Sequence, residues 1–130
     1  MRCPTCENPL SQVITGDITV DVCKGGCGGI WFDNFELRKV DEPHESAGEA
    51  LLDIERNDKI DVDHSKRRRC PKCGAIIMMQ HFHSVKQHVE LDECPGCGGY
   101  WLDPGELAAI RRAFRTEEER QKAAEEYFSE

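Results

Sequence analysis

Short apolar runs separated by turn residues set the pattern of hydrophobic and polar positions along this chain, and they predict two β-hairpins. In the first hairpin, residues 10–15 and 18–22 flank Gly16-Asp17, a dipeptide suited to a tight turn. In the second, residues 75–83 and 88–93 flank a short polar turn.

Each hairpin is followed by residues that favour the start of a helix. Asp33 with Glu36, and Asp103 with Glu106, have the spacing of an N-cap residue and a carboxylate three positions later. Pro104 falls at the first helical position, where a missing N–H does no harm. We interpret these acidic residues as helix caps and not as catalytic groups.

Residues 41–66 form a charged linker between the two hairpin units, and an amphipathic pattern within them predicts a short helix at about 47–57. Ser46 and Glu49 have the spacing of a capping box at its start.

A second helical pattern covers the C-terminal segment, residues 104–130. Leu107, Ile110 and Phe114 give it a brief apolar stripe. A new capping signal predicts a break near Arg115–Thr116.

Eight cysteines in four close pairs change the picture, because pairs of thiols suit a tetrahedral metal site. Reduced cysteines that hold metal are favoured over a disulfide framework, since no apolar targeting segment opens the chain. A unit of about 40 residues also needs such support to fold. We expect two Zn²⁺ ions, one per set of ligands: Cys3, Cys6, Cys23 and Cys27 for site 1, and Cys70, Cys73, Cys94 and Cys97 for site 2.

The cysteine turns differ in detail. Glycine follows the second cysteine of three pairs, where it permits a left-handed turn that aims backbone N–H groups at sulfur. Glu7 takes that position after Cys6. Three residues, not two, separate Cys23 from Cys27, which predicts a small bulge and a looser first site. Trp31 and Trp101 are expected to pack beside the metals as a substitute for a larger core, and exposed stacking on nucleic acid is the weaker alternative.

Both copies of the cysteine pattern continue with the same motif. They read Cys-Pro-x-Cys and then Cys-x-Gly-Cys-Gly-Gly-x-Trp-[Phe/Leu]-Asp-x-x-Glu-Leu, with the extra residue noted above in the first copy, over residues 1–38 and 70–107. This pattern resembles the zinc ribbon family named after the zinc finger of transcription factor IIB. The resemblance implies a zinc ribbon with four cysteine ligands in each copy.

The expected fold is a small metal-stabilised α+β protein. It consists of two zinc ribbons, which are antiparallel β-hairpins with four-cysteine knuckles, each followed by a helix, and a C-terminal helical segment. The expected division is ribbon 1 at 1–40, the linker at 41–66, ribbon 2 at 67–103 and the helical segment at 104–130.

The formal net charge of −8 argues against a general phosphate binder, because affinity for nucleic acid depends on positive charge. Two filled four-thiolate sites, each with a charge of −2, would lower the total further, to about −12. One local basic cluster, Lys66, Arg67, Arg68 and Arg69, is a candidate nucleic-acid contact. His81, His83 and His88 are candidates for a weak extra metal site, although ordinary exposed strand residues are the favoured interpretation.

These features favour a non-enzymatic, cytoplasmic adaptor that binds an unidentified protein partner, in a transcription-related assembly. Four sulfurs leave no open position for a catalytic water, and neither a membrane nor a small-molecule substrate is expected. Direct binding of nucleic acid through Lys66–Arg69 and ribbon 2, or a thiol redox or zinc sensor, are the alternatives. Iron in place of zinc would indicate electron transfer.

Overall fold

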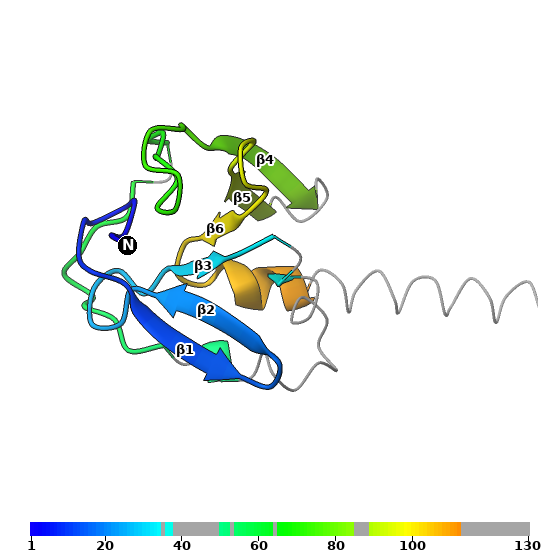
Figure 1. Cartoon of the computed structure of the whole chain (residues 1–130). Coiled ribbons are helices and arrows are strands. Elements are labelled where there is room, and N and C mark those ends of the chain that lie inside the picture. Colours follow the sequence, from blue (N-terminus) through cyan, green and yellow to red (C-terminus); the bar gives the residue numbers. More distant parts are fainter. Residues whose placement is uncertain (35, 38–49, 53, 64, 85–88, 113–130) are drawn as a thin grey trace, which may run out of the picture.

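The computed structural model describes residues 1–34, 36–37, 50–52, 54–63, 65–84 and 89–112. These residues form one six-stranded antiparallel sheet, in the order β1-β2-β3-β6-β5-β4 (Figure 1). Its strands are β1 (Ser11–Thr15), β2 (Ile18–Val22), β3 (Ile30–Phe32), β4 (Met79–Ser84), β5 (Val89–Glu93) and β6 (Tyr100–Leu102).

Both predicted hairpins are present. β1 pairs with β2 across a turn in which Gly16 has a φ of 58°, a left-handed value that glycine adopts without strain. β4 pairs with β5, with a shift of register between Phe82 and Ser84. The strand expected from residue 75 begins only at Met79, because the residues before it pair elsewhere. The N–H of Met78 donates to the carbonyl of Arg68, ahead of the second cysteine turn.

The two ribbons are joined through a third strand in each copy, which the sequence pattern did not predict. β3 pairs with β6, so that Trp31 lies opposite Trp101 and Ile30 opposite Leu102. The two copies are therefore neighbours within one continuous sheet.

Alternation along these two central strands gives the sheet two buried faces. On one face, Ile30, Phe32 and Leu102 join an aliphatic cluster with strand β2. On the other face, Trp31 and Trp101 join a cluster that contains buried cysteines of both metal sites. The metal sites thus share one core, and the aliphatic cluster forms the other.

A helix begins at residue 106 and covers the aliphatic face of the sheet (Figure 1). Glu106 Oε2 accepts a hydrogen bond from the N–H of Asp103 at 3.0 Å, as the predicted capping box requires. Leu107 and Ile110 are buried against the sheet. Phe114, the expected break near Arg115–Thr116 and the rest of the C-terminal segment lie outside the described residues. Within the described residues, no helix is both long and apolar enough to cross a membrane.

The other expected helices are shorter or absent where the structure describes them. After Asp33 the described residues form a turn, with Leu37 buried. In the linker, residues 50–51 form a short 3-10 segment, but residues 54–57 are not helical. The prediction of a helix to about residue 57 is therefore wrong at its end. The predicted start at 47–49 lies outside the described residues.

The backbone of those linker residues has other partners. The carbonyl of Glu55 accepts a hydrogen bond from the N–H of Gly25 at 2.7 Å, and the N–H of Asn57 donates to the carbonyl of Gly26 at 2.7 Å. These residues therefore bind the cysteine turn beside them instead of continuing a helix.

Candidate metal centres

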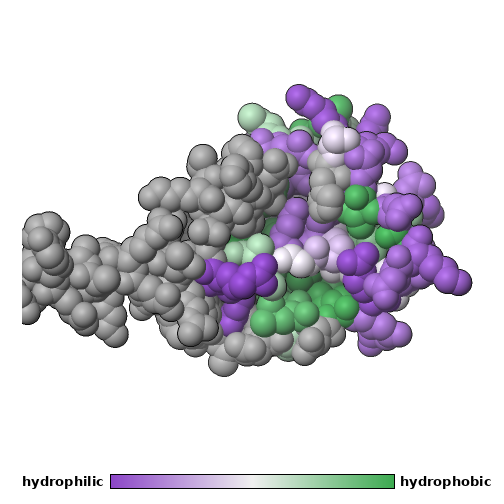
Figure 2. Space-filling model, turned by 180° about the vertical axis from the view of Figure 1, so that it is seen from behind, coloured by the Kyte–Doolittle hydropathy of each residue, from purple (hydrophilic) through white to green (hydrophobic). Residues whose placement is uncertain are grey.

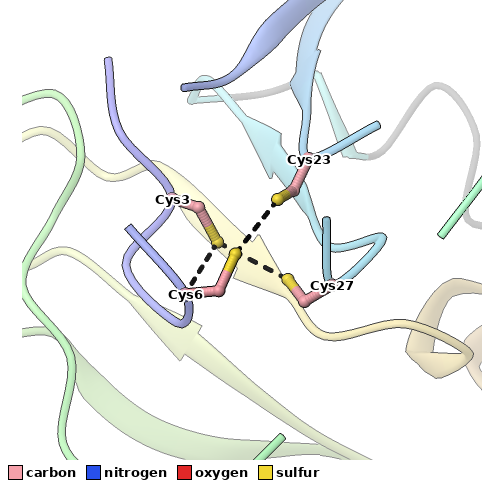
Figure 3. Close-up of side chains that lie close together, drawn as sticks. All are labelled: Cys3, Cys6, Cys23 and Cys27. Atoms are coloured by element: carbon pink, nitrogen blue, oxygen red, sulfur yellow. Dashed lines mark hydrogen bonds between the residues drawn. The ribbon is translucent and has the colours of Figure 1, made fainter. Parts of the chain in front are cut away.

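Each set of four cysteines is gathered into a cage. In site 1 the side chains of Cys3 and Cys6 come from the first turn of the chain and point toward those of Cys23 and Cys27 (Figure 3). The sulfurs within each set all lie within 4.8 Å of one another. All eight cysteines are free thiols, since a disulfide would place two sulfurs about 2 Å apart.

The cage dimensions fit zinc. Four Zn–S bonds of about 2.3 Å in tetrahedral geometry place neighbouring sulfurs about 3.8 Å apart. In site 2 the sulfurs of Cys70 and Cys97, and those of Cys73 and Cys94, are 3.8 Å apart. In site 1 the corresponding distances are slightly shorter, at 3.5 Å between Cys3 and Cys27 and 3.3 Å between Cys6 and Cys23. The donors are all soft thiolates, so the residues present fit two structural Zn²⁺ ions.

Local hydrogen bonds hold the sulfurs of the first turn. The backbone N–H groups of Thr5 and Cys6 donate to Cys3 Sγ at 3.4 Å and 3.5 Å. The side chain of Asn8 donates to Cys6 Sγ at 3.2 Å. Such donors spread the negative charge of a thiolate cage, and Asn8 is a contributor that the sequence pattern did not reveal.

The left-handed positions occur where the sequence predicted them. Gly28, Gly74 and Gly98 have φ values of 83°, 74° and 75°. Glu7, which stands at the same position of the first turn, has a φ of 65° and is the one non-glycine residue with a positive φ among the described residues. The first turn therefore keeps its shape at a conformational cost.

The extra residue between Cys23 and Cys27 is absorbed at Gly25, whose φ is 76° and whose N–H is bound by the linker. The expected looser packing of site 1 is not seen. Cys3, Cys23 and Cys27 are buried and Cys6 is half-buried, whereas in site 2 Cys73 is exposed. The linker covers the longer turn between Cys23 and Cys27, so site 1 is the more enclosed cage.

Within each cage the thiols differ in acidity. Burial tends to raise the pKa of Cys6, but hydrogen bonds from Asn8 and Cys23 outweigh it, and the pKa falls to about 6. In site 2 the backbone N–H groups of Cys97 and Gly96 likewise outweigh burial and lower the pKa of Cys94 to about 7. Burial raises the pKa of Cys70 to about 12. A bound metal ion would supply the positive charge that keeps all four sulfurs deprotonated.

The two tryptophans are fully buried, which excludes the stacking alternative. A Cβ at Gly29 would overlap the ring of Trp101, and a Cβ at Gly99 would overlap the ring of Trp31. Each indole therefore lies against the second glycine of the Gly-Gly pair in the other ribbon, where only a residue without a side chain fits.

The aspartate that ends each motif is also shared between the ribbons. Trp31 Nε1 donates to Asp33 Oδ1 at 3.3 Å, and Lys72 of the other ribbon contacts the same oxygen at 3.3 Å. In the second copy, Trp101 Nε1 donates to Asp103 Oδ1 at 3.2 Å, and Thr5 Oγ1 of the first ribbon donates to it at 3.3 Å.

The repeated motif is thus the contact between the two ribbons. Sequence reasoning assigned its glycines, tryptophan and aspartate to local turns, packing and capping. The signal for a contact was available, because Gly-Gly-x-Trp-x-Asp is the same in both copies although the intervening strands differ.

One member of the basic cluster has a structural role. Arg68 is only 3% exposed, and its Nη1 donates to Asp92 at 3.3 Å and to Asp103 at 2.5 Å. Its other terminal nitrogen donates to the carbonyl of Asp63 at 2.8 Å. The prediction of a nucleic-acid contact is therefore wrong for Arg68, because two buried carboxylates hold its charge.

Lys66, Arg67 and Arg69, the other members of the cluster, are exposed. The histidine candidates are not tested: His81 and His83 are on strand β4, and their side chains, like the whole of His88, lie outside the described residues.

Comparison with known proteins agrees with this geometry. The model of a family described as a transcription factor zinc-finger, of the TFIIB zinc ribbon type, matches residues 2–42 and 69–113. No curated protein and no solved structure matches the chain.

Proposed function

Because the chain belongs to the transcription factor zinc-finger family, and because both of its metal centres are closed by four sulfurs, we propose that it is a non-enzymatic adaptor that binds a protein partner. The closed cages carry this proposal. A catalytic zinc keeps one position for water or substrate, whereas four cysteine ligands fill a tetrahedral ion.

The metals then serve to present a surface. Each ribbon is too small to fold on a hydrophobic core alone, and its sulfurs occupy the centre of the buried tryptophan face. The binding activity of such a protein resides on its exposed side chains, outside the two cages. Hydrophilic residues cover most of the described part of the face seen in Figure 2, with smaller hydrophobic areas between them.

The overall charge favours a protein partner over nucleic acid. The chain is acidic, with a formal net charge of −8, and filled cages add to this. Long-range repulsion would slow the approach of a polyanion. The family description supports a place in a transcription-related assembly.

The test is affinity capture with the zinc-loaded full chain as bait, after nuclease treatment. A Cys70→Ser/Cys94→Ser variant, which opens site 2, is the comparison, and Lys59→Gln, an exposed change in the linker, is the control. We expect a specific partner that the control retains and the cysteine variant loses. An identical set of proteins on all three baits would refute docking by the folded ribbons.

A further inference from the structure

A groove of about 830 Å³ lies between the two Cys-Pro-x-Cys turns. One wall is formed by residues 2–7 of the first ribbon, and the other by residues 66–71 and Gly74 of the second. The groove exists only because the two ribbons are joined through β3 and β6. It is therefore a surface that neither copy has alone.

Cations dominate the exposed side chains of this groove. Arg2, Lys66, Arg67 and Arg69 are exposed at its edge, and Glu7 is the acidic residue among those that line it. These four cations form no salt bridge with another described residue. They are available to a partner.

The backbone beneath these cations is fixed. Arg2 and Arg69 each form a β-bridge, with Pro9 and with Ile77. Between Arg67 and Arg69, the buried side chain of Arg68 anchors the basic segment to the sheet. A ligand would thus meet cations on rigid backbone, which lowers the entropy lost on binding.

We propose that this groove is the docking site of the adaptor and that it binds an acidic peptide segment of the partner; this inference rests on the proposed function. Arginine side chains bind carboxylates through paired hydrogen bonds, and three of the four cations are arginines.

An acidic peptide fits the groove better than nucleic acid does. The negatively charged cages lie directly behind it, since Cys3, Cys6 and Cys70 are among its lining residues. A short peptide places a few carboxylates next to individual arginines, whereas a nucleic acid brings a continuous row of phosphates toward an acidic molecule.

The experiment measures fluorescence polarisation with zinc-loaded full chain and two labelled probes, a short peptide of alternating Asp and Glu and a single-stranded oligonucleotide of matched length. The test variant is Arg67→Gln/Arg69→Gln. The control is Lys24→Gln/Lys59→Gln, which removes the same charge from exposed positions outside the groove.

We expect the peptide to bind more tightly than the oligonucleotide and to lose about tenfold or more in affinity in the test variant, while the control stays near the native value. Equal losses in both variants, tighter binding of the oligonucleotide, or no binding of the peptide would each overturn the inference. Zinc content, measured for every variant, excludes unfolding as the cause.

Affinity capture separates this inference from the proposed function. A partner that Arg67→Gln/Arg69→Gln retains and Cys70→Ser/Cys94→Ser loses would refute docking in the groove but would still support the proposed adaptor function. Loss of that partner in both variants is the expected result.

Discussion

At the scale of single residues, the two Cys-Pro-x-Cys turns have the same backbone conformation with different residues after the second cysteine. Glu7 in the first turn and Gly74 in the second both have φ near 70°, at 65° and 74°. A left-handed conformation costs a residue with a Cβ about 1–2 kcal/mol, and glycine adopts it freely. The sequence made this comparison possible, because both positions follow the second cysteine of a pair.

Glu7→Gly should therefore stabilise the zinc-loaded chain, by up to about 1 kcal/mol after the added freedom of the unfolded chain is subtracted. Gly74→Ala should destabilise it by about 1 kcal/mol, through backbone strain alone, since nothing lies within 4 Å of the added Cβ. Urea unfolding at saturating zinc measures both. Changes of the same sign in the two variants would contradict the argument.

Arg68 shows that the sequence does not reveal whether a charged side chain is buried. In a run of four basic residues, only the fold reveals that one is buried between Asp92 and Asp103. Arg68→Met should cost about 3–5 kcal/mol of unfolding free energy, because it leaves two buried carboxylates without their cation. The neighbouring Arg67→Met, at an exposed position, should change it by less than about 0.5 kcal/mol. Similar losses in the two variants would show that Arg68 is not a structural residue.

Glu106 gives the molecule a pH dependence apart from its metals. Burial, with the nearby charges of Asp103 and Asp92, raises its pKa from 4.5 to about 8. A carboxyl with a raised pKa favours folding while it is protonated, so its contribution is complete below about pH 4.5 and is lost as the pH rises through 8.

Glu106→Gln should remove this loss. Its unfolding free energy should fall less between pH 5 and 8 than that of the native chain, by more than about 1 kcal/mol, because one pKa unit corresponds to about 1.4 kcal/mol. Urea titrations at saturating zinc across this range provide the measurement. Parallel pH profiles would show that Glu106 is ionised throughout.

At the scale of elements, the sequence predicted what depends on neighbours along the chain. Both hairpins, the capping box at Asp103 and the two thiolate cages follow from local spacing. The linker helix failed beyond residue 53 for a tertiary reason, since Glu55 and Asn57 give their backbone groups to the wide cysteine turn. The third strand of each ribbon was missed because three residues carry too little periodicity to detect.

The cysteine turns also differ in access, which sets the order in which they react. When zinc is bound, every ligand is a thiolate, so exposure decides which sulfur a reagent reaches. Cys73 is exposed and Cys6 is half-buried. Brief treatment of the zinc-loaded chain with an alkylating reagent should modify Cys73 before Cys6 and release zinc from site 2 first.

Peptide mass spectrometry against time, with released zinc followed in parallel, gives that order. In the metal-free chain this order should be lost, because without zinc the cage that shields Cys6 is not held together. Earlier modification of Cys6 while zinc is bound would contradict the exposures described above.

At the scale of the whole molecule, the exchange of contacts between ribbons makes one folding unit from two copies. Each tryptophan lies against a glycine of the other ribbon, and β3 pairs with β6. One copy by itself has no partner surface with which to form this arrangement. It depends on two surfaces that fit each other.

Gly99→Ala should therefore disturb both ribbons. The added methyl group overlaps the ring of Trp31, and crowding of this kind typically costs about 1–3 kcal/mol. We expect one cooperative unfolding transition, shifted as a whole, with weaker zinc retention at both sites in a chelator titration. Weaker retention at site 2 alone would show that the ribbons fold independently. Gly74→Ala, whose Cβ meets no atom, is the matched control, and the loss in Gly99→Ala should exceed the roughly 1 kcal/mol expected of that control from backbone strain.

The reciprocal packing of Trp31 and Trp101 also suggests how a chain with two copies of the ribbon originates. The contact is self-complementary, so two separate single-copy chains carrying the motif would have the surfaces needed to pair as a two-fold dimer. When the two copies are joined in one polypeptide, their pairing becomes intramolecular. It then depends on a high effective concentration set by the linker and no longer on the protein concentration. Once tethered, the halves no longer need to be identical, and each is free to diversify. The differences at Thr5 and Lys72 are of this kind, since both reach the aspartate of the opposite half with different chemistry.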